Sequence, residues 1–87
     1  IGETGYHQKG LGLAATRLTM KHGFENLNLN RIYLYVCEAN SRAINTYEKA
    51  GFVHEGILRE AVFKQGRYVN LVLMSVLKSE WVRLPTK

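Results

Sequence analysis

The sequence predicts one domain, residues 1–87, of the α/β class with a mixed sheet. Three observations support this prediction. Two helical patterns flank a short run of β-branched and aromatic residues. The chain then continues into two strand-like runs joined by a short turn that contains glycine. Finally, 87 residues suffice for one modest hydrophobic core. The expected order is glycine loop, helix, strand, helix and antiparallel hairpin.

The first helix is expected from Leu11 to about Leu27, because apolar residues recur there at helical spacing. They form two stripes on opposite faces, which predicts that the helix is contacted from two sides. One stripe comprises Leu11, Ala14, Ala15 and Leu18, and the other comprises Leu13, Met20, Phe24 and Leu27. A three-stranded sheet cannot cover both stripes. We therefore expect self-association, or packing against an N-terminal half of the fold that these residues do not include.

A strand and a second helix are expected next. Residues 31–37, RIYLYVC, show no clear alternation, which is typical of a strand buried on both faces. Cys37 is expected in the core, because a free cysteine usually behaves as a small buried apolar residue. Asn40 or Ser41 can cap the following helix, and Gly51 stands where a left-handed residue often ends one. The buried side of that helix should comprise Ala43, Ile44, Tyr47 and Ala50.

The end of the chain predicts an antiparallel hairpin. Residues 52–63 and 68–77 have strand character, and KQGR at 64–67 is a turn. The strand–helix–strand crossover before it should be parallel and right-handed. A strand normally leads into a glycine loop, yet only residues 1–5 are available for one. We therefore expect that this chain is a fragment, or that it takes the strand from another polypeptide.

Composition narrows the class of function. The formal charge of +5 indicates either an anionic partner or ordinary surface variation. The basic residues are dispersed, so no nucleic-acid partner is expected. No apolar run approaches a membrane span of about 18 residues, and IGETGYHQKG has no apolar signal core, so no membrane partner is expected. The lone Cys37 fits a reducing, cytoplasmic compartment, and three scattered histidines predict no metal site.

The stretch QKGLGLA, residues 8–14, has features of a phosphate-binding loop. Without Cβ atoms, Gly10 and Gly12 let backbone amides approach an anion closely. The following helix offers unpaired N–H groups and the positive end of its dipole, and Lys9 adds a charge. A plain glycine-rich turn is the alternative. Residues 10–15 also fit the G-x-G-x-x-A dinucleotide pattern, for which Glu38 would be a late ribose-binding acid.

The segment NSRAINTYEKAGF, residues 40–52, favours a different family. Together with the glycine loop and the hairpin, it resembles the GCN5-related N-acetyltransferase (GNAT) superfamily. Its signature Asn-x-x-Ala-x-x-x-Tyr-x-x-x-Gly-Phe is matched in full by Asn40, Ala43, Tyr47, Gly51 and Phe52. The similarity runs from about residue 5 to residue 77 and corresponds to the C-terminal half of that fold.

Two other parts of the chain resemble the superfamily less closely. Its cofactor loop reads Arg/Gln-x-x-G-x-G/A, and this chain has His7 in the first place. The last hairpin is similar to the branch that includes ribosomal-protein alanine, spermidine and amino-sugar N-acetyltransferases. That branch often has Gly-x-Tyr/Trp-x-Asp, whereas here Tyr68 is followed by Val69 and Asn70.

The resemblance implies that the chain binds acetyl-CoA. The pyrophosphate would lie on the loop amides, and the pantetheine arm would lie between the strand ending near residue 5 and strand 31–37. The implied cofactor-binding residues are Gln8, Lys9, Gly10, Leu11, Gly12, Leu13, Ala14, Asn40, Ala43 and Tyr47.

The implied reaction transfers the acetyl group to a primary amine of a small molecule or a protein N-terminus by direct attack. Tyr47 would protonate the departing thiolate, because a phenol with a pKa of about 10 is protonated at neutral pH. Alternatively, Tyr47 packs on the sheet. The chain as a whole has two other interpretations. It is a non-catalytic half-fold that binds CoA weakly or assembles with a partner, or it is a dinucleotide-binding module.

Overall fold

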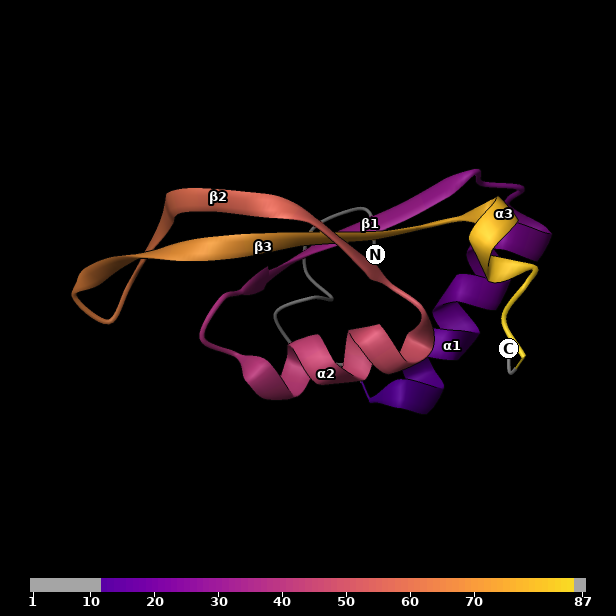
Figure 1. The fold of residues 1–87 in the computed structure, drawn as a ribbon, viewed down its shortest axis with the longest axis horizontal. Coiled ribbons are helices and arrows are strands. Elements are labelled where there is room, and N and C mark those ends of the chain that lie inside the picture. Colours follow the sequence, from indigo (N-terminus) through magenta and orange to yellow (C-terminus); the bar gives the residue numbers. More distant parts are fainter. Residues whose placement is uncertain (1–11, 86–87) are drawn as a thin grey trace.

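The computed structural model describes residues 12–85 and shows the predicted order of elements (Figure 1). Most of the glycine loop, including Leu11, lies outside the described residues. The elements are α1 (Leu13–Lys21), the π-helical turn η2 (His22–Asn26), β1 (Arg31–Cys37), α2 (Ser41–Ala50), β2 (Val53–Lys64), β3 (Arg67–Leu77) and α3 (Lys78–Trp81). The α/β class and the helix–strand–helix–hairpin order are therefore confirmed.

The three strands form one sheet in the order β1-β3-β2. Because β3 is antiparallel to both neighbours, β1 and β2 run parallel to each other, as predicted for a crossover through α2. The hairpin turn consists of two residues, Gln65 and Gly66, with φ of 51° and 82°. Two successive left-handed residues are typical of the type I′ turn, whose twist matches that of the flanking strands.

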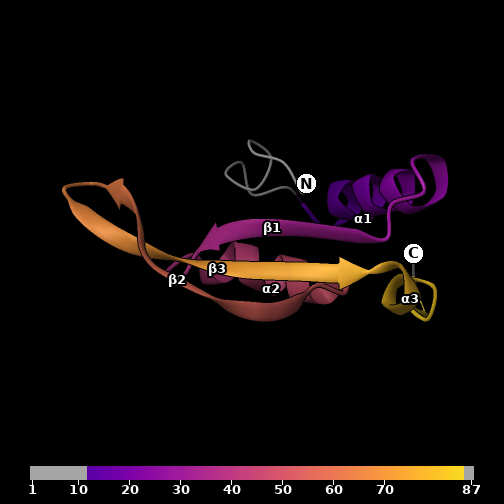
Figure 2. The same ribbon diagram turned by 90° about the horizontal axis from the view of Figure 1, so that it is seen from above.

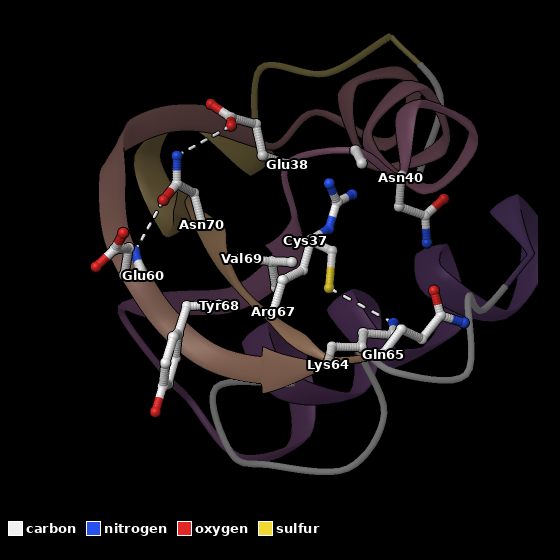
Figure 3. A pocket seen from close by; sticks show the side chains of 11 residues that line it. Cys37, Glu38, Asn40, Glu60, Lys64, Gln65, Arg67, Tyr68, Val69 and Asn70 are labelled. Atoms are coloured by element: carbon white, nitrogen blue, oxygen red, sulfur yellow. Dashed lines mark hydrogen bonds between the residues drawn. The ribbon is translucent and has the colours of Figure 1, made fainter.

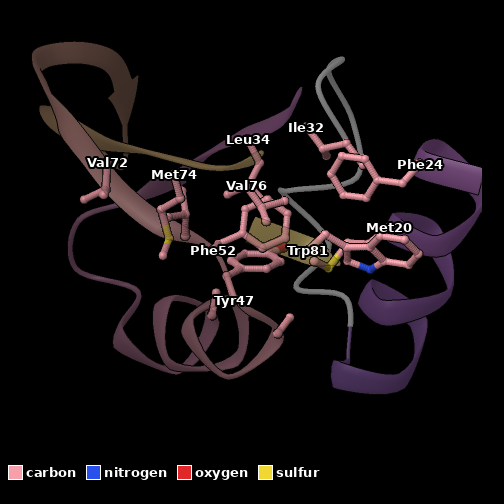
Figure 4. Packing of buried hydrophobic residues seen from close by; sticks show 13 residues of the cluster. Met20, Phe24, Ile32, Leu34, Tyr47, Phe52, Val72, Met74, Val76 and Trp81 are labelled. Carbon is pink, nitrogen blue, oxygen red and sulfur yellow. The ribbon is translucent and has the colours of Figure 1, made fainter. Parts of the chain in front are cut away.

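The core lies between one face of the sheet and the two longer helices. Helix α2 runs beneath the sheet in Figure 1, and Figure 2 shows α1 alongside β1. Figure 4 shows the side chains of the core. The strands contribute Ile32, Leu34, Val36, Val72, Met74 and Val76, and the rest of the chain contributes Met20, Phe24, Ala43, Tyr47, Ala50, Phe52 and Trp81. Alternate residues of β1 and β3 thus point toward the helices, as the period of a strand requires.

The other face of β1 is only half-buried, so the expectation that this strand is buried on both faces is wrong. Tyr33, Tyr35 and Cys37 are intermediate in exposure, because no described helix covers that face. The prediction that Cys37 belongs to the core is wrong for the same reason. Its Sγ lies 3.7 Å from Nζ of Lys64, at the end of the strand.

The two stripes of the first helix have different surroundings. Met20 and Phe24 are each 1% exposed, whereas Leu18 is 69% exposed. The middle of one stripe is therefore in the core, although Leu27 at its end is 56% exposed, and the rest of the described chain leaves the other stripe open. Gly23 is buried where the helix approaches β1: a Cβ there would lie 2.8 Å from Cδ1 of Ile32. The missing side chain permits that close approach.

Both ends of α2 are capped as predicted. Oδ1 of Asn40 accepts from the amide of Ala43 at 3.1 Å. At the other end Gly51 has a φ of 112°. There the amide of Phe52 donates to the carbonyl of Tyr47 at 2.9 Å, and that of Gly51 donates to Glu48 at 3.0 Å. This pair of bonds is the Schellman motif, which requires a left-handed residue.

The C-terminal helix α3 closes the end of the core. Oε1 of Glu80 accepts from the amide of Leu77 at 2.9 Å and so caps the first turn. The ring of Trp81 packs against that of Phe24 with centroids 5.2 Å apart. The chain after β3 therefore contributes to the core.

The distal part of the hairpin, residues 58–71, extends away from the core and is called the hairpin arm below (Figure 1). It accounts for much of the elongated shape, which measures 40 × 20 × 19 Å. Within β2 only Val62 is half-buried, and every other residue of the strand is exposed. The pairing of β2 with β3 shifts register between Leu58 and Val62, and Glu60 within this bulge has a φ of 48°. Such a bulge bends a strand and re-aims its side chains.

Candidate functional site

The start of α1 has the properties expected of an anion-binding helix terminus. Helix α1 has no side-chain cap and no acidic residue in its first turn. The amides of Leu13 and Ala14 therefore lie at the positive end of the helix dipole, and no side chain caps them. Gln8, Lys9, Gly10 and Leu11, which were predicted to share this role, lie outside the described residues.

The backbone at Gly12 does not itself require glycine. Its φ of −67° and ψ of 166° are open to any residue. A Cβ at this position would meet nothing within 4 Å among the described atoms. A small residue would still be needed if an anion approached the amides closely, since glycine removes the side chain that would obstruct it.

A groove of about 700 Å³ lies between the end of β1, the start of α2 and the hairpin arm (Figure 3). Cys37, Glu38 and Asn40 line it from one side, and side chains of the arm line it from the other. A more apolar hollow of about 310 Å³ adjoins it and shares Cys37, Asn40 and Lys64. Asn40 therefore lies at the junction of the two spaces.

Asn70 connects the two sides of this groove. Its Nδ2 donates to Oε1 of Glu38 at 3.1 Å, and its Oδ1 accepts from the amide of Glu60 at 2.8 Å. Its backbone carbonyl also accepts from the amide of Glu38 at 3.0 Å. One half-buried side chain thus joins the end of β1 to the bulge of β2, where it orients the carboxylate of Glu38 and fixes the backbone of Glu60.

The predicted site residues of α2 occupy different environments. The cap uses Oδ1 of Asn40, which leaves the Nδ2 group to donate toward the groove. Ala43 is buried beneath the sheet at 6% exposure. Tyr47 is 0% exposed and meets Phe52 edge-on at 5.7 Å, so it does not line the groove. Of these three residues, the structure therefore brings only Asn40 to an open space. The burial of Tyr47 and its contact with Phe52 are those of a core residue.

A separate polar cluster lies at the other end of β1. Nη2 of Arg31 contacts both carboxylate oxygens of Glu55 at 2.8 Å, and the hydroxyl of Ser75 donates to the same carboxylate. The hydrogen bond from Ser75, followed by that from Arg31, holds the pKa of Glu55 below its ordinary value. Arg31 also lies over the ring of Tyr33, 5.1 Å from its centroid. This cluster pins the edge strand β2 to β1 across the central strand.

Residues 12–85 contain no group of three His, Cys, Asp or Glu side chains that could hold a metal ion. Every helix in that range is too short or too polar to span a bilayer.

A family model for the acetyltransferase (GNAT) domain matches residues 1–53. The chain belongs to the GNAT family. The match covers the glycine loop, α1, β1 and all of α2, and so it includes every residue predicted to bind the cofactor. It confirms the resemblance inferred from the signature at residues 40–52.

The GNAT chain is also similar to curated proteins. It is 39% identical over 77 residues to "Spermidine N(1)-acetyltransferase" of Escherichia coli, covering 88% of this chain and 41% of the relative. It is 34% identical over 76 residues to "Putative ribosomal N-acetyltransferase YdaF" of Bacillus subtilis, covering 87% of this chain and 42% of the relative. The chain thus spans well under half the length of these relatives.

Solved structures agree on the fold. Spermidine N-acetyltransferase from Vibrio cholerae "in complex with CoA and spermine" superposes with a TM-score of 0.79 at 37% identity, over 82% of this chain and 42% of that one. A chimera of the same V. cholerae enzyme gives a TM-score of 0.80 at 36% identity, over 83% of this chain and 43% of that one. The prediction that this GNAT chain corresponds to part of the fold is confirmed.

The groove at the hairpin arm was largely missed by sequence reasoning. Glu38 was considered only as a ribose-binding acid, and Asn70 only as a departure from a hairpin pattern. Their contact joins positions 32 residues apart and depends on the register of β1 with β3. The available signal was the pair of adjacent charged residues, Arg59 and Glu60, at the middle of β2.

Proposed function

We propose that this chain is the cofactor-binding part of an N-acetyltransferase, which transfers an acetyl group from acetyl-CoA to a primary amine. The observation that carries the proposal is the start of α1. Its first-turn amides have no cap, Gly12 faces open space, and the family match includes this segment. An uncapped helix N-terminus preceded by glycine suits a diphosphate.

Acetyl-CoA supplies the thioester whose carbonyl carbon the amine attacks, so that a C–N bond forms as the C–S bond breaks. The chain's residues would bind and orient the cosubstrate. Amides of residues 8–14 would hold the pyrophosphate, and Nδ2 of Asn40 would donate to an amide oxygen of the pantetheine arm. The cap that fixes Asn40 at 3.1 Å from the amide of Ala43 supports this role, because it pre-orients the side chain.

Tyr47 is the proposed acid for the leaving thiolate. Its position in the signature supports the role, and a phenol with a pKa of about 10 carries its proton at neutral pH. Its complete burial favours the packing alternative. The two roles make different predictions for the hydroxyl, which is why one substitution separates them.

Calorimetric titration tests the cofactor assignment. CoA should bind and NAD should not, which also separates this proposal from the dinucleotide alternative. Gly12→Asp places a negative charge beside the amides and should abolish CoA binding. Gly56→Asp is the matched control, because a Cβ there also meets nothing within 4 Å and lies on β2. Equal CoA affinity in the Gly12 variant and the parent would show that the phosphate is bound elsewhere.

Tyr47→Phe tests the acid. The ring and its packing on Phe52 remain, so the free energy of unfolding should change little. Turnover with an amine acceptor should fall by roughly 10²–10³, the scale for a positioned general acid. CoA affinity should change far less, since the loss is specific to the transition state. Unchanged turnover would assign Tyr47 to packing alone.

The second candidate function is a CoA-binding half-fold that assembles with another chain. It is favoured by the open stripe of α1, where Leu18 is 69% exposed. Light scattering at micromolar concentration tests it. A dispersed monomer with protected core amides would contradict self-association, and turnover by that monomer would exclude the non-catalytic alternative.

A further inference from the structure

The groove beside the hairpin arm carries both signs of charge. Glu38 and Glu60 contribute two carboxylates, and Lys64 and Arg67 contribute two cations, so the formal charges cancel. None of these four side chains forms a salt bridge with another residue of the range 12–85. All four charges are therefore available to a bound molecule.

The negative side of the groove is held in place by Asn70. Its amide group bonds Glu38 and the backbone of Glu60, at 3.1 and 2.8 Å. Glu60 is also fixed by its left-handed backbone within the bulge. In Figure 3, Glu38 and Glu60 flank Asn70. The positions from which both carboxylates extend are thus set by the fold.

The positive side is set by the hairpin turn. Lys64 and Arg67 are paired residues that close the two-residue turn. Nζ of Lys64 lies 3.7 Å from Sγ of Cys37, on the opposite side of the groove from Glu60 (Figure 3). The ammonium of Lys64 therefore stands where the far end of a molecule held by Glu38 would lie, and Arg67 adds a second cation to the lining of the groove.

A polyamine matches this arrangement poorly. Its second and third ammonium groups would meet Lys64 or Arg67, in a chain whose formal charge is already +5. An amine with a carboxylate a few bonds away pairs with both sides of the groove. A peptide α-amine, with an ordinary pKa of about 8, also loses its proton more readily than an alkylamine of about 10.

We propose that this groove selects an acceptor with one ammonium and a neighbouring carboxylate, such as a peptide N-terminus with glutamate in second place, and discriminates against polyamines. The assignment rests on the proposed acetyltransferase function and names the acceptor class of the same site. Glu38 and Glu60 hold the amine, and Lys64 and Arg67 hold the carboxylate.

Three probes test the selection in the full chain with CoA present. They are an N-terminal tetrapeptide with glutamate second, the same peptide with lysine second, and spermidine. Dissociation constants should favour the glutamate peptide by about tenfold over each of the others at low ionic strength, and salt should reduce the preference. Equal or tighter binding of spermidine, or no binding of any probe, would overturn the proposal.

Lys64→Glu is the decisive variant. It should weaken the binding of the glutamate peptide and strengthen the binding of spermidine, each by about tenfold, so that the preference is inverted. Lys49→Glu makes the same change of charge on the exposed end of α2, away from the groove, and should keep the parent's order of affinities. An unchanged order of affinities in the Lys64 variant would show that the groove does not recognise the carboxylate of the peptide.

The test of acceptor selection can be distinguished from the test of the proposed acetyltransferase function. Titration with CoA alone decides whether the cofactor binds. CoA binding with the opposite acceptor order contradicts only the selection proposed here. Acceptor selection without CoA binding would support the groove and contradict the acetyltransferase assignment.

Discussion

The helix-covered side of the sheet and the hairpin arm are built from similar residues that are buried to very different degrees. In β3, Met74 and Val76 are 0% exposed. In the arm, Phe63 and Tyr68 are each 64% exposed and pack on each other, with centroids 5.1 Å apart. Apolar burial is the dominant favourable term in folding. The stability of the domain therefore resides in the covered side, and the arm can vary to suit a ligand or partner.

Truncating one phenylalanine in each region should give the largest contrast. Phe24→Ala removes a ring that is 1% exposed and packed on Trp81, and should lower the free energy of unfolding by about 3–5 kcal/mol. Phe63→Ala removes the same atoms from the arm and should cost less than about 1 kcal/mol. Urea denaturation measures both. Comparable losses would show that the arm is buried in solution, for example in an oligomer.

Two glycines sharpen the contrast at the backbone, one at the end of α2 and one on the exposed strand β2 just before the hairpin arm. Gly51→Ala forces a side chain into a left-handed residue, 2.8 Å from Cδ1 of Leu84, and should cost about 1–3 kcal/mol. Gly56→Ala adds the same methyl group to β2 with nothing within 4 Å. Its effect should stay within about 0.5 kcal/mol. The midpoint of thermal unfolding distinguishes the two, and a similar shift in both would contradict the assigned environments.

Asn40 lies where the two regions meet, and its cap and its groove contact can be separated. Asn40→Ala removes the acceptor for the amide of Ala43 and should cost about 1 kcal/mol. Asn40→Ser restores a capping oxygen and most of that stability. Both variants lose the Nδ2 donor, so CoA affinity should fall in both if that donor binds the pantetheine arm. Normal affinity in the serine variant would leave Asn40 with the cap alone.

Glu55 predicts a small pH dependence where its carboxylate on β2 meets Arg31 of β1 and Ser75 of β3. Its folded-state pKa is lowered by Ser75 and Arg31, so the ionised form favours the folded chain. That contribution is present above the ordinary carboxyl pKa and is lost as pH falls through the lowered one. Glu55→Gln should therefore flatten the acid limb of the stability curve. Glu25→Gln, on the exposed side of η2, serves as the control, and an equal change in both variants would contradict the assignment.

Local chemistry made most of the fold predictable. The cap at Asn40, the left-handed Gly51 and the turn at 64–67 each depend on residues close in sequence, and each was placed correctly. The helix α1 was also identified, since the helical spacing of its apolar residues is independent of what the helix packs against. These features are determined by backbone geometry within a few residues, which is why one sequence suffices.

Features set by long-range packing were not predictable. Cys37 was assigned to the core because free cysteines usually are, but its burial depends on what covers the second face of β1. The bulge at Glu60 depends on a hydrogen bond from its amide to Asn70, ten residues away. The groove follows from that bulge and from the register of β1 with β3. A candidate site built by such contacts emerges only once the strands are paired.

The packing of Trp81 on Phe24 has a consequence for fluorescence. Trp81 is the only tryptophan of the chain and is 5% exposed. Fluorescence excited at the red edge of the indole band therefore reports on one contact, between the last helix α3 and the π-helical turn η2. The hairpin arm contains no tryptophan and so contributes no emission to that measurement. Emission colour should thus report the opening of the helical end of the molecule independently of any ligand that the arm engages.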